Sequence, residues 1–244
     1  MAKTAQAPRL VRVPRHITRG SRAGRLRKRV VILGAAGLGR AFYQALVSRG
    51  TGGAVVGFLD DGRTGSFCGL PILGRCRDLP TLAKTLRLTH VGLGVGYQYF
   101  DDRQELIAMV NETGCCAWQS AIHASAIVSP DVQMGQGVYI SMGTIVSTGT
   151  RIGNYGVIWS GSAMEHDNDI GEDVYIATGV ITAGRVTINS HAFIGMGSVV
   201  AKCTIGAYAT IGAGSVVLED VPDHTYAWGR PARAVKDKPQ PAYV

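Results

Sequence analysis

An aliphatic or methionine side chain returns at every sixth position through the second half of this 244-residue chain. Thr182 is the one residue of the unbroken register that is not apolar, and the residue four places after each position is usually small. After Val200 the register shifts by one residue and then resumes. Its members are Ile122, Val128, Met134, Ile140, Val146, Ile152, Ile158, Met164, Ile170, Ile176, Thr182, Ile188, Ile194 and Val200, followed by Ile205, Ile211 and Val217.

This repeat predicts a parallel β-helix. Three hexapeptide units make one triangular coil, with the large aliphatic side chain inside and the small residue near a corner. About 17 units would give between five and six coils, stacked at ~4.8 Å spacing. A β-sandwich would show apolar residues at every second position and irregular turns, so the register favours the β-helix.

Strands alternate with helices before the repeat begins. A strand, a glycine-rich turn and a helix are predicted from Val30 to Gly50, followed by strands at 54–61 and 89–96 and helices at 79–86 and 101–114. This alternation predicts a small parallel sheet of the doubly wound, Rossmann-like kind. We therefore expect a basic tail (1–29), a Rossmann-like domain (30–118), a β-helix domain (119–235) and a C-terminal tail (236–244).

The formal net charge of +8 is concentrated at the N-terminus. Residues 1–29 hold ten Lys or Arg and no acidic residue, whereas the remainder of the chain is slightly acidic. Low apolar content and high charge predict a disordered tail, with an organelle transit peptide as the less favoured interpretation. For the folded body we expect no nucleic-acid partner, because its charge is not basic.

The apolar segments exclude two further classes of protein. No apolar run reaches the ~18 residues of a membrane span, and the N-terminus has no apolar signal core, which predicts a cytoplasmic protein without a membrane span. The five cysteines are odd in number and lack C-x-x-C spacing, which argues against a disulfide framework and against a zinc site.

Three adjacent polar residues, Glu165, His166 and Asp167, directly follow the inward-facing Met164. They should lie at the surface of the prism, in the turn after a strand. Histidine takes a proton near neutral pH, and an adjacent carboxylate can orient its ring and stabilise the imidazolium, as a general base requires. Gly184 follows one coil later, where its amide could donate to a developing oxyanion. A merely solvated polar turn is the alternative.

The other histidines are weaker candidates. His191 and His123 could each cap a turn or lie in solvent, and a three-histidine zinc site needs more imidazoles at workable spacing. We therefore expect no metal. No cysteine falls within the repeat units of His166 or Gly184, so an acyl-cysteine intermediate has no support.

A glycine-rich turn follows the first predicted strand, and Asp60 ends the second. Gly34, Gly37 and Gly39 could let a phosphate approach the backbone at the start of a helix. Their G-x-x-G-x-G spacing differs from the G-x-G-x-x-G fingerprint of dinucleotide-binding domains, and close packing of the helix is an alternative reason for such glycines.

Several segments, in their order along the chain, resemble one known enzyme family. They are the glycine-rich opening with "FLDD" after it, "IHASAIVSPD", "EHD", "ITAGRVTI" and "WGRPARAV". From about Val30 to Lys236 the chain resembles the sialic acid O-acetyltransferase and bacillosamine or perosamine N-acetyltransferase family of hexapeptide-repeat sugar acyltransferases. The resemblance implies a left-handed β-helix and a homotrimer with active sites between neighbouring β-helices. It further implies acetyl-CoA-dependent transfer to an amino or hydroxyl group of a sugar, often nucleotide-linked, in polysaccharide biosynthesis.

The resemblance also assigns roles to individual residues. His166 matches the general base, Asp167 in the triplet with Glu165 matches its partner, and Gly184 matches an amide that holds the acetyl carbonyl. The residues implied for coenzyme A are Tyr175, Gly195, Gly197, Ala213, Arg230, Pro231 and Arg233. Those implied for the nucleotide sugar are Gly34, Gly37, Gly39, Arg40, Asp60 and Asp61.

Two positions depart from the family pattern. Leu38 replaces the histidine of a common Gly-His-Gly turn, and Tyr175 stands where several members have a second histidine. Three alternatives therefore stay open: acyl transfer to a small non-nucleotide acceptor, a first domain that is vestigial or binds NAD, and a non-catalytic trimeric scaffold in which the basic tail is the working part.

Overall fold

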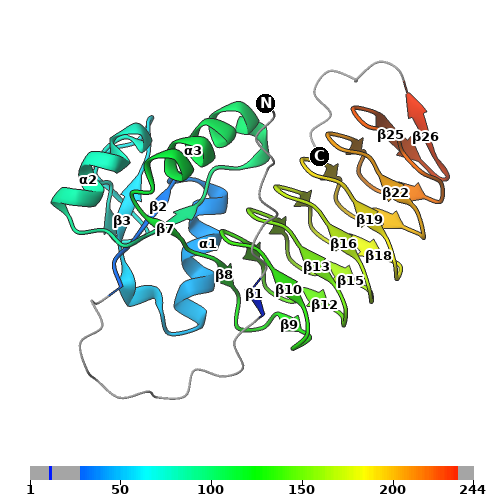
Figure 1. Ribbon diagram of the computed structural model, residues 1–244, viewed down its shortest axis with the longest axis horizontal. Coiled ribbons are helices and arrows are strands. Elements are labelled where there is room, and N and C mark those ends of the chain that lie inside the picture. Colours follow the sequence, from blue (N-terminus) through cyan, green and yellow to red (C-terminus); the bar gives the residue numbers. More distant parts are fainter. Residues whose placement is uncertain (1–10, 13–27, 236–244) are drawn as a thin grey trace, which may run out of the picture. The chain divides into compact units, whose positions relative to one another are not determined.

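The computed structural model describes residues 11–12 and 28–235 and divides into two compact units between Ala124 and Ser125 (Figure 1). This division falls a few residues beyond the boundary expected from the sequence. Most of the predicted basic tail, residues 1–10 and 13–27, and the predicted C-terminal tail, residues 236–244, lie outside the described residues.

The predicted parallel β-helix is confirmed in the second unit. Its two-residue strands stack into three sheets, one on each side of a triangular prism. The first sheet contains β10 (Gln133–Met134), β13 (Arg151–Ile152), β16 (Asp169–Ile170), β19 (Thr187–Ile188) and β22 (Thr204–Ile205). The second contains β9 (Ile127–Val128), β12 (Ile145–Val146), β15 (Ala163–Met164), β18 (Ile181–Thr182), β21 (Val199–Val200) and β24 (Val216–Val217). The third contains β11 (Tyr139–Ile140), β14 (Val157–Ile158), β17 (Tyr175–Ile176), β20 (Phe193–Ile194), β23 (Thr210–Ile211), β25 (Tyr226–Gly229) and β26 (Ala232–Val235).

The hexapeptide register sets the pairing of the coils. Each strand pairs in parallel with the strand one coil later, so that Met164 lies opposite Thr182. The inward-facing members, such as Ile140 and Ile176, are fully buried. Where the register shifts, Thr187 pairs with Thr204, so this coil is one residue shorter and the inward positions stay aligned. The missing residue of this coil is thus accommodated in a turn, and the inward-facing side chains of the strands stay on the inner face.

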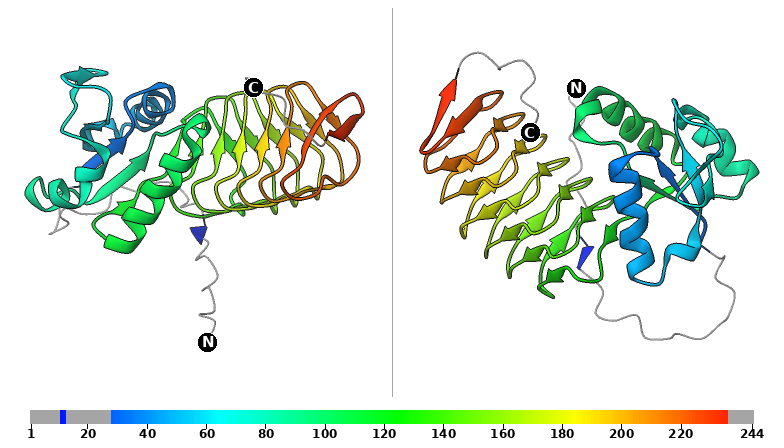
Figure 2. Two further views of the ribbon diagram at one scale, coloured as in Figure 1. Left: turned by 90° about the horizontal axis from the view of Figure 1, so that it is seen from above. Right: turned by 180° about the vertical axis from the view of Figure 1, so that it is seen from behind.

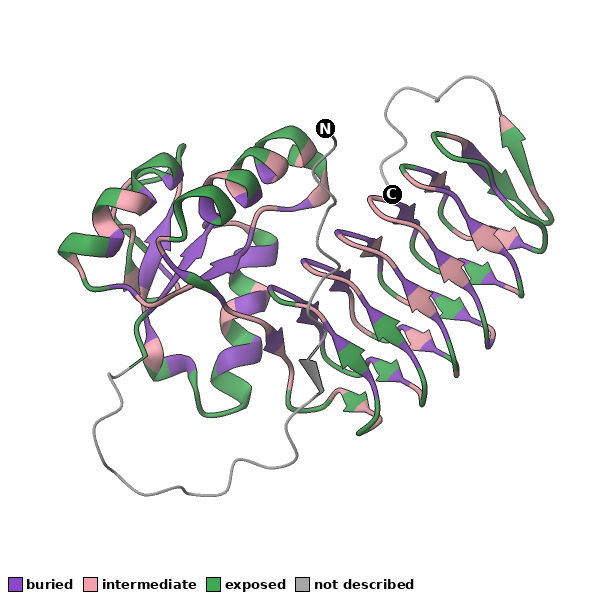
Figure 3. Ribbon diagram, in the orientation of Figure 1, coloured by how far each residue is buried: buried purple, intermediate pink, exposed green. Residues whose placement is uncertain are grey.

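The outward-facing residues make the three sides of the prism chemically different. The polar face carries Gln133, Arg151, Asp169, Thr187 and Thr204. The aromatic face carries Tyr139, Val157, Tyr175, Phe193, Thr210 and Tyr226. The aliphatic face carries Ile127, Ile145, Ala163, Ile181, Val199 and Val216, and many of these are exposed although apolar (Figure 3).

A short N-terminal strand also belongs to this unit. β1 (Val11–Arg12) pairs antiparallel with β10, which is the first strand of the polar face. Within the described residues, the repeat supplies no earlier coil on the polar face, and β1 occupies the ladder position next to β10.

The first unit, coloured from blue to green in Figure 2, contains a four-stranded parallel sheet with the order β3-β2-β6-β7. Its strands are β2 (Val30–Leu33), β3 (Val55–Leu59), β6 (His90–Leu93) and β7 (Ala117–Trp118), with β8 (Ala121–Ile122) at the end of the unit. Its helices are α1 (Gly37–Ser48), α2 (Leu79–Thr85) and α3 (Phe100–Thr113), with 3-10 turns at Gly52–Ala54, Cys76–Asp78 and Tyr97–Tyr99. A small hairpin of β4 (Ser66–Phe67) and β5 (Leu70–Pro71) follows β3.

This strand order defines where a ligand can enter the sheet. The chain runs from β2 to β3 on one side and then crosses back to β6 on the other side of β2, so the direction of strand addition reverses at β2. In parallel α/β sheets, ligands bind at the carboxyl ends of the strands at such a switch point. Here that point lies between the ends of β2 and β6. None of the helices in the described part of the chain has the length and apolarity needed to cross a membrane.

Candidate active site

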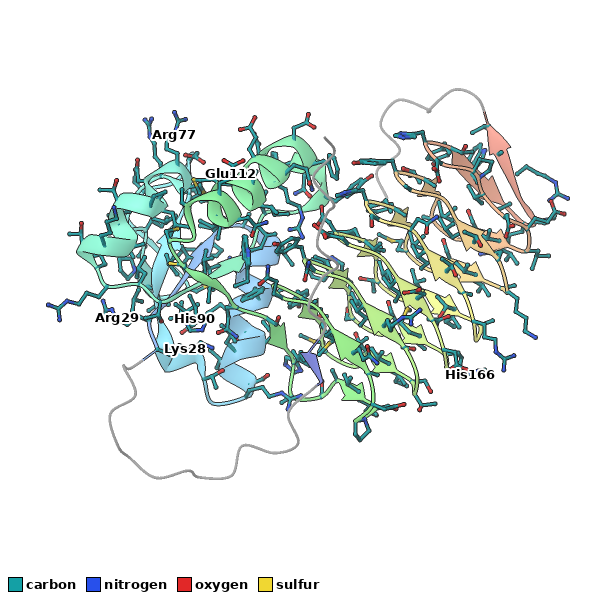
Figure 4. All side chains as sticks on the ribbon, in the orientation of Figure 1. Lys28, Arg29, Arg77, His90, Glu112 and His166 are labelled. Atoms are coloured by element: carbon teal, nitrogen blue, oxygen red, sulfur yellow. The ribbon has the colours of Figure 1, made fainter. Side chains whose placement is uncertain are left out.

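His166 and Asp167 lie in the turn that joins the aliphatic face to the polar face, on the outside of the β-helix (Figure 4). The two side chains contact each other, with His166 Nδ1 2.9 Å from Asp167 Oδ2. About half of each side chain is exposed, 45% for His166 and 53% for Asp167. A carboxylate can only accept a hydrogen bond, so Nδ1 carries the proton, and in the neutral ring Nε2 keeps its lone pair.

Two glycines from neighbouring coils shape the space around this pair. A Cβ added at Gly184 would lie 2.4 Å from His166 Nε2, so the imidazole packs directly against the Gly184 backbone. A Cβ added at Gly149 would lie 2.2 Å from Asp167 Oδ1. Both side chains therefore occupy room that only glycine leaves, one coil above and one coil below.

Gly184 also presents a hydrogen-bond donor beside the imidazole. Its amide donates to no other group in the described part of the chain, whereas the next amide, of Arg185, donates to His166 O at 2.9 Å. The Arg185 side chain places Nε 4.0 Å from Asp167 Oδ2, although 68% of that side chain is exposed. The predicted constellation of His166, Asp167 and Gly184 is thus assembled at one corner of the prism.

Glu165 contributes to the site through hydrogen bonds of its backbone amide and carbonyl, not through its side chain. Its side chain is exposed, and its amide donates to Thr182 Oγ1 at 3.3 Å. Its carbonyl accepts from Thr150 Oγ1 at 3.1 Å and from Asn168 Nδ2 at 2.8 Å. Glu165 therefore ties the start of the turn that carries His166 and Asp167 to the interior of the prism.

A second histidine–carboxylate pair occupies a different corner. His191 Nδ1 lies 3.7 Å from Asp173 Oδ2, in the turns that join the polar face to the aromatic face. The His191 ring stacks on Tyr208 at 4.6 Å, and Tyr208 stacks on His224 at 4.8 Å. These spacings match the rise of one coil, so the column is explained as stacking within the β-helix. No group of three His, Cys, Asp or Glu side chains in the described residues has the geometry of a metal site.

The glycines and alanine predicted to contact coenzyme A lie in the turns that join the aromatic face to the aliphatic face. A Cβ on Gly195 would lie 2.6 Å from Ala213 N, so coil stacking alone already requires glycine there. Gly197 has a φ of +67° and open space beside it, and Ala213 is exposed. Within one chain these residues and His166 therefore lie on opposite edges of the aliphatic face.

The predicted coenzyme residue Tyr175 belongs to a row of rings on the aromatic face. It stacks on Phe193 at 5.4 Å and lies 6.3 Å from Trp159, which contacts Tyr139 edge-on at 5.6 Å. Stacking of this kind holds the Tyr175 ring against its neighbours. The sequence prediction included Tyr175 but missed the rest of the row.

The closing hairpin of β25 and β26 carries the remaining coenzyme candidates. Arg230 Nε donates to Gly214 O at 2.7 Å, which holds this guanidinium at the turn between the aromatic and aliphatic faces. The Arg230–Pro231 peptide bond is cis. Arg233 Nη1 lies 3.9 Å from Glu219 Oε2 at the surface. Two guanidinium groups at the same end of the prism suit a phosphorylated ligand.

Glycines pack tightly at the switch point of the first unit. A Cβ on Gly39 would lie 2.0 Å from Gly34 O, and one on Gly34, which has a φ of +89°, would lie 2.9 Å from Gly94 O. Close packing of α1 against β2 and β6 therefore explains these two predicted residues. Gly37 differs, because a Cβ added there would have nothing within 4 Å, and this residue begins α1. An anion could approach the helix N-terminus at this position.

Two adjacent carboxylates at the end of β3 have different surroundings. Asp60 accepts the amide of Ala35 at 2.7 Å on one oxygen and that of Gly62 at 3.0 Å on the other, so it holds the turn after β2. Asp61 is exposed. The Arg40 guanidinium lies 5.1 Å above the Phe67 ring, at the same end of the sheet. Of the two predicted carboxylates, Asp61 is the more exposed, although it also lies beside the Cys76 thiol.

Leu38, the departure from the family pattern, is 4% exposed and belongs to the buried face of α1. Its side chain packs in the core of the unit. The turn therefore offers a ligand backbone amides rather than a polar side chain at this position.

The buried cysteines stay protonated. Burial, aided by the adjacent Asp61 carboxylate, raises the pKa of Cys76 to about 12, and burial raises the pKa of Cys116 to about 12 and that of Cys203 to about 11. A thiol must ionise to act as a nucleophile. These three cysteines are therefore unsuited to carry an acyl group at neutral pH.

Four residues surround the turn of His166 and Asp167 but were not predicted as site residues: Gly149, Arg185, Asn168 and Thr182. Gly149 and Arg185 lie 18 residues before and after Asp167, so the coil length could have identified them. The hydrogen bonds of Asn168 and Thr182 depend on side-chain rotamers in the interior, for which the register carries no signal.

Neither a protein-family model nor a curated protein sequence matches the chain. Solved structures do match it. A variant of GDP-perosamine N-acetyltransferase from Caulobacter crescentus, in complex with CoA and GDP-perosamine, is 31% identical with a TM-score of 0.81, over 88% of this chain and 100% of that one. The acetyltransferase domain of PglB from Neisseria gonorrhoeae, in complex with acetyl coenzyme A, is 27% identical with a TM-score of 0.79, over 85% and 99%.

WeeI from Acinetobacter baumannii, 22% identical with a TM-score of 0.56, shares the fold over 85% of this chain and 100% of its own.

A hexapeptide β-helix with an outward His–Asp pair, preceded by a small parallel α/β unit, defines a hexapeptide-repeat acyltransferase. The chain belongs to the family of sugar acyltransferases that comprises the sialic acid O-acetyltransferases and the bacillosamine or perosamine N-acetyltransferases.

Proposed function

We propose that this enzyme transfers the acetyl group of acetyl-CoA to an amino group of a nucleotide-linked sugar. The observation that carries the proposal is the contact of His166 Nδ1 with Asp167 Oδ2, which leaves Nε2 beside the free amide of Gly184. The similar protein from Caulobacter crescentus has GDP-perosamine and CoA bound in its structure, and its name states transfer to perosamine nitrogen.

His166 acts as the general base. An acceptor amine attacks a thioester only with a free electron pair, and it must lose a proton as the new C–N bond forms. Nε2 takes that proton, and Asp167 stabilises the resulting imidazolium through the proton on Nδ1. The C–S bond then breaks, and the departing coenzyme A thiolate accepts the proton from His166.

Gly184 stabilises the transition state. The thioester carbonyl oxygen becomes negatively charged as the amine adds, and an amide that already points at that position lowers the barrier without reorganising. The transfer is direct, because none of the five cysteines lies in the repeat units of His166 or Gly184, and burial raises the pKa of Cys76, Cys116 and Cys203. The coenzyme itself is held by Tyr175, Gly195, Gly197, Ala213, Arg230, Pro231 and Arg233.

The Rossmann-like first unit binds the nucleotide part of the acceptor at its switch point. Gly37 leaves the N-terminus of α1 open to a phosphate, Gly34 and Gly39 let the turn pack closely, and Arg40 adds a positive charge nearby. Asp61 accepts hydrogen bonds from the ribose or the base. A product of this kind would serve polysaccharide biosynthesis, and use of acetyl-CoA fits the cytoplasmic location expected from the sequence.

The working enzyme is a homotrimer of left-handed β-helices. Four of the six apolar residues in line on the aliphatic face are exposed to a degree that an isolated chain has no reason to keep, with Ile127 at 65%, Ile145 at 45%, Ile181 at 48% and Val199 at 40%. The catalytic turn borders one edge of this face and the coenzyme residues border the other. Packing between copies along this face would bring the two sets together in one site.

The proposal is tested with acetyl-CoA and a panel of nucleoside diphosphate amino sugars. Replacing His166 with Ala should lower kcat by roughly 100-fold or more, because it removes the base. The affinity for acetyl-CoA and the thermal stability should change little, since the side chain is half exposed. Full activity of His166→Ala would exclude His166 as the base.

A second candidate function is acyl transfer to a small amine or alcohol without a nucleotide. The observation that favours it is Leu38, which places no polar side chain in the first turn. Titration with UDP, GDP, dTDP and NAD separates the candidates. Binding of one nucleoside diphosphate supports the nucleotide sugar. Absence of all binding, with acetylation of a free amine, supports the second candidate, and binding of NAD alone supports a dinucleotide site.

A further inference from the structure

Thr182, the exception in the hexapeptide register, has a fully buried hydroxyl inside the prism. A buried hydroxyl is unfavourable unless it is hydrogen-bonded, and valine would fill the same space. Thr182 Oγ1 accepts Asn168 Nδ2 at 2.6 Å and the Glu165 amide at 3.3 Å, and it lies 3.9 Å from Met164 Sδ. Its partners thus come from the end of β15 and from both sides of His166 in the turn that follows.

Asn168 links three segments of chain from the centre of this network. Its Nδ2 donates to Glu165 O at 2.8 Å as well as to Thr182, and its Oδ1 accepts the Val186 amide at 2.8 Å. The side chain is 1% exposed, and both N–H groups and the carbonyl oxygen are used. The end of the catalytic turn is therefore fixed to its own start and to the next coil.

Only His166 and Asp167 lie between these fixed ends. The Asp167 amide donates to Thr148 O and His166 O accepts the Arg185 amide, both at 2.9 Å. Asp167 has a φ of +58°, the left-handed conformation that the turns of the β-helix also show at Asp173 and Arg185. The interior hydrogen bonds of Asn168 and Thr182 add to this shared turn geometry, because they fix both ends of the segment that carries His166 and Asp167.

We propose that Thr182 and Asn168 are positioning residues, which hold the turn so that His166 and Asp167 keep their contact and Nε2 faces the acceptor. This inference rests on the proposed role of His166. Neither side chain contacts solvent, so both act through the turn and not on the substrate. This role explains why the inward-facing register has a polar residue at Thr182. Its hydroxyl is needed inside the prism to hold the turn that presents His166 outside.

Thr144 offers a matched control. It is equally buried, and its hydroxyl donates to Trp159 O at 3.1 Å, at a corner away from His166. Thr144→Val and Thr182→Val remove the same atom from the same interior. Only the second should alter the catalytic turn.

The experiment compares Thr182→Val, Thr182→Ser and Thr144→Val by melting temperature, steady-state kinetics and NMR of ¹⁵N-histidine. We expect Thr182→Val to lower kcat by roughly 10-fold or more while the KM for acetyl-CoA changes little, because misplacement of a catalytic group affects the chemical step. Thr182→Ser keeps the hydroxyl and should restore kcat. Thr144→Val should lower the melting temperature and leave kcat unchanged.

The NMR readout does not depend on catalysis. The His166 ring, identified by its absence in His166→Ala, should be a single tautomer protonated at Nδ1 in the wild type and in Thr144→Val, and a mixture in Thr182→Val. Wild-type kcat and ring signals in a less stable Thr182→Val would overturn the proposal, as would an equal loss of kcat in Thr144→Val. If Thr182→Val does not fold, Asn168→Ala removes the same network from its other side and is read in the same way. Failure of the proposed function would appear separately, as full activity of His166→Ala.

Discussion

At the scale of single residues, the positions of His166 and Asp167 depend on the absence of a side chain at Gly184 and Gly149. The imidazole of His166 lies where a Cβ of residue 184 would be, and the carboxylate of Asp167 lies where a Cβ of residue 149 would be. In a stacked coil, each position is bounded by the residues one coil above and below. A glycine there makes a recess in the ladder, and the recess fixes where an outward side chain can lie.

Gly184→Ala should therefore lower kcat by about 100-fold, because the new methyl group would lie 2.4 Å from His166 Nε2 and displace the ring. Gly184 does not have a positive φ, so the alanine backbone is unstrained and the melting temperature should stay close to that of the wild type. Gly53→Ala, where nothing lies within 4 Å and φ is also not positive, is the control. A wild-type kcat in Gly184→Ala would show that catalysis does not require the His166 ring to lie against residue 184.

The thiols give a second prediction at this scale. Burial raises the pKa of Cys76 and Cys116 to about 12, so their thiolate forms become significant only at strongly alkaline pH. Iodoacetamide at pH 8 should leave both unmodified and leave acetyl transfer unchanged, as peptide mass spectrometry and an activity assay would show. Inactivation that acetyl-CoA prevents would instead indicate a cysteine in the acyl-transfer path.

At the scale of elements, two adjacent carboxylates at the end of β3 have different roles. One supports the turn after β2, and the other is available to a ligand. Both carboxylate oxygens of Asp60 accept hydrogen bonds from backbone amides of the turns around it, whereas Asp61 is exposed. A binding site needs both a carboxylate that contacts the ligand and a neighbouring group that holds the backbone of that carboxylate in place.

Asp60→Ala should lower the melting temperature, because it leaves the Ala35 and Gly62 amides without their acceptor. Asp61→Ala should leave the melting temperature unchanged and weaken nucleotide binding by roughly 10-fold, as one lost hydrogen bond to a charged group would. Calorimetric titration and thermal unfolding measure both effects, with the exposed Glu105→Ala on α3 as the control. Equal nucleotide affinity in Asp61→Ala and the wild type would remove Asp61 from the site.

The elements also show how far sequence reasoning reaches. The six-residue period predicts the inward side of every coil, and the alternation before it predicts α1, α2 and α3, because burial follows the period of the backbone. The same period placed Gly184 beside His166. It could not predict that Asn168 and Thr182 bond across the interior, or that Gly34 and Gly39 pack against the end of β6, since those contacts depend on the three-dimensional approach of distant segments.

At the scale of the whole molecule, the proposed trimer depends on the aliphatic face. Replacing Ile181, which is 48% exposed, with Glu would place a charge in the centre of an apolar contact and should convert the trimer to monomers. Activity should fall together with the trimer if the site needs both edges of the face. Gln133→Glu adds a charge on the polar face and should change neither. Light scattering after gel filtration measures the assembly, and a fully active Ile181→Glu monomer would show that one chain contains a complete site.

The basic N-terminal segment gives the last prediction, because the cores described for both units lie within residues 28–235 while β1 pairs with β10. A chain that begins at Lys28 should keep its trimer and its kcat, since no proposed site residue precedes Gly34. Loss of β1 removes only a two-residue ladder, so the melting temperature should fall by no more than about 4 °C. A chain that begins at Leu10 keeps β1 and separates its contribution from that of the preceding residues. Loss of the trimer in the Lys28 chain alone would show that β1 is needed to complete the first coil, and loss of acetyl transfer in both chains would place residues 1–9 in the enzyme's function.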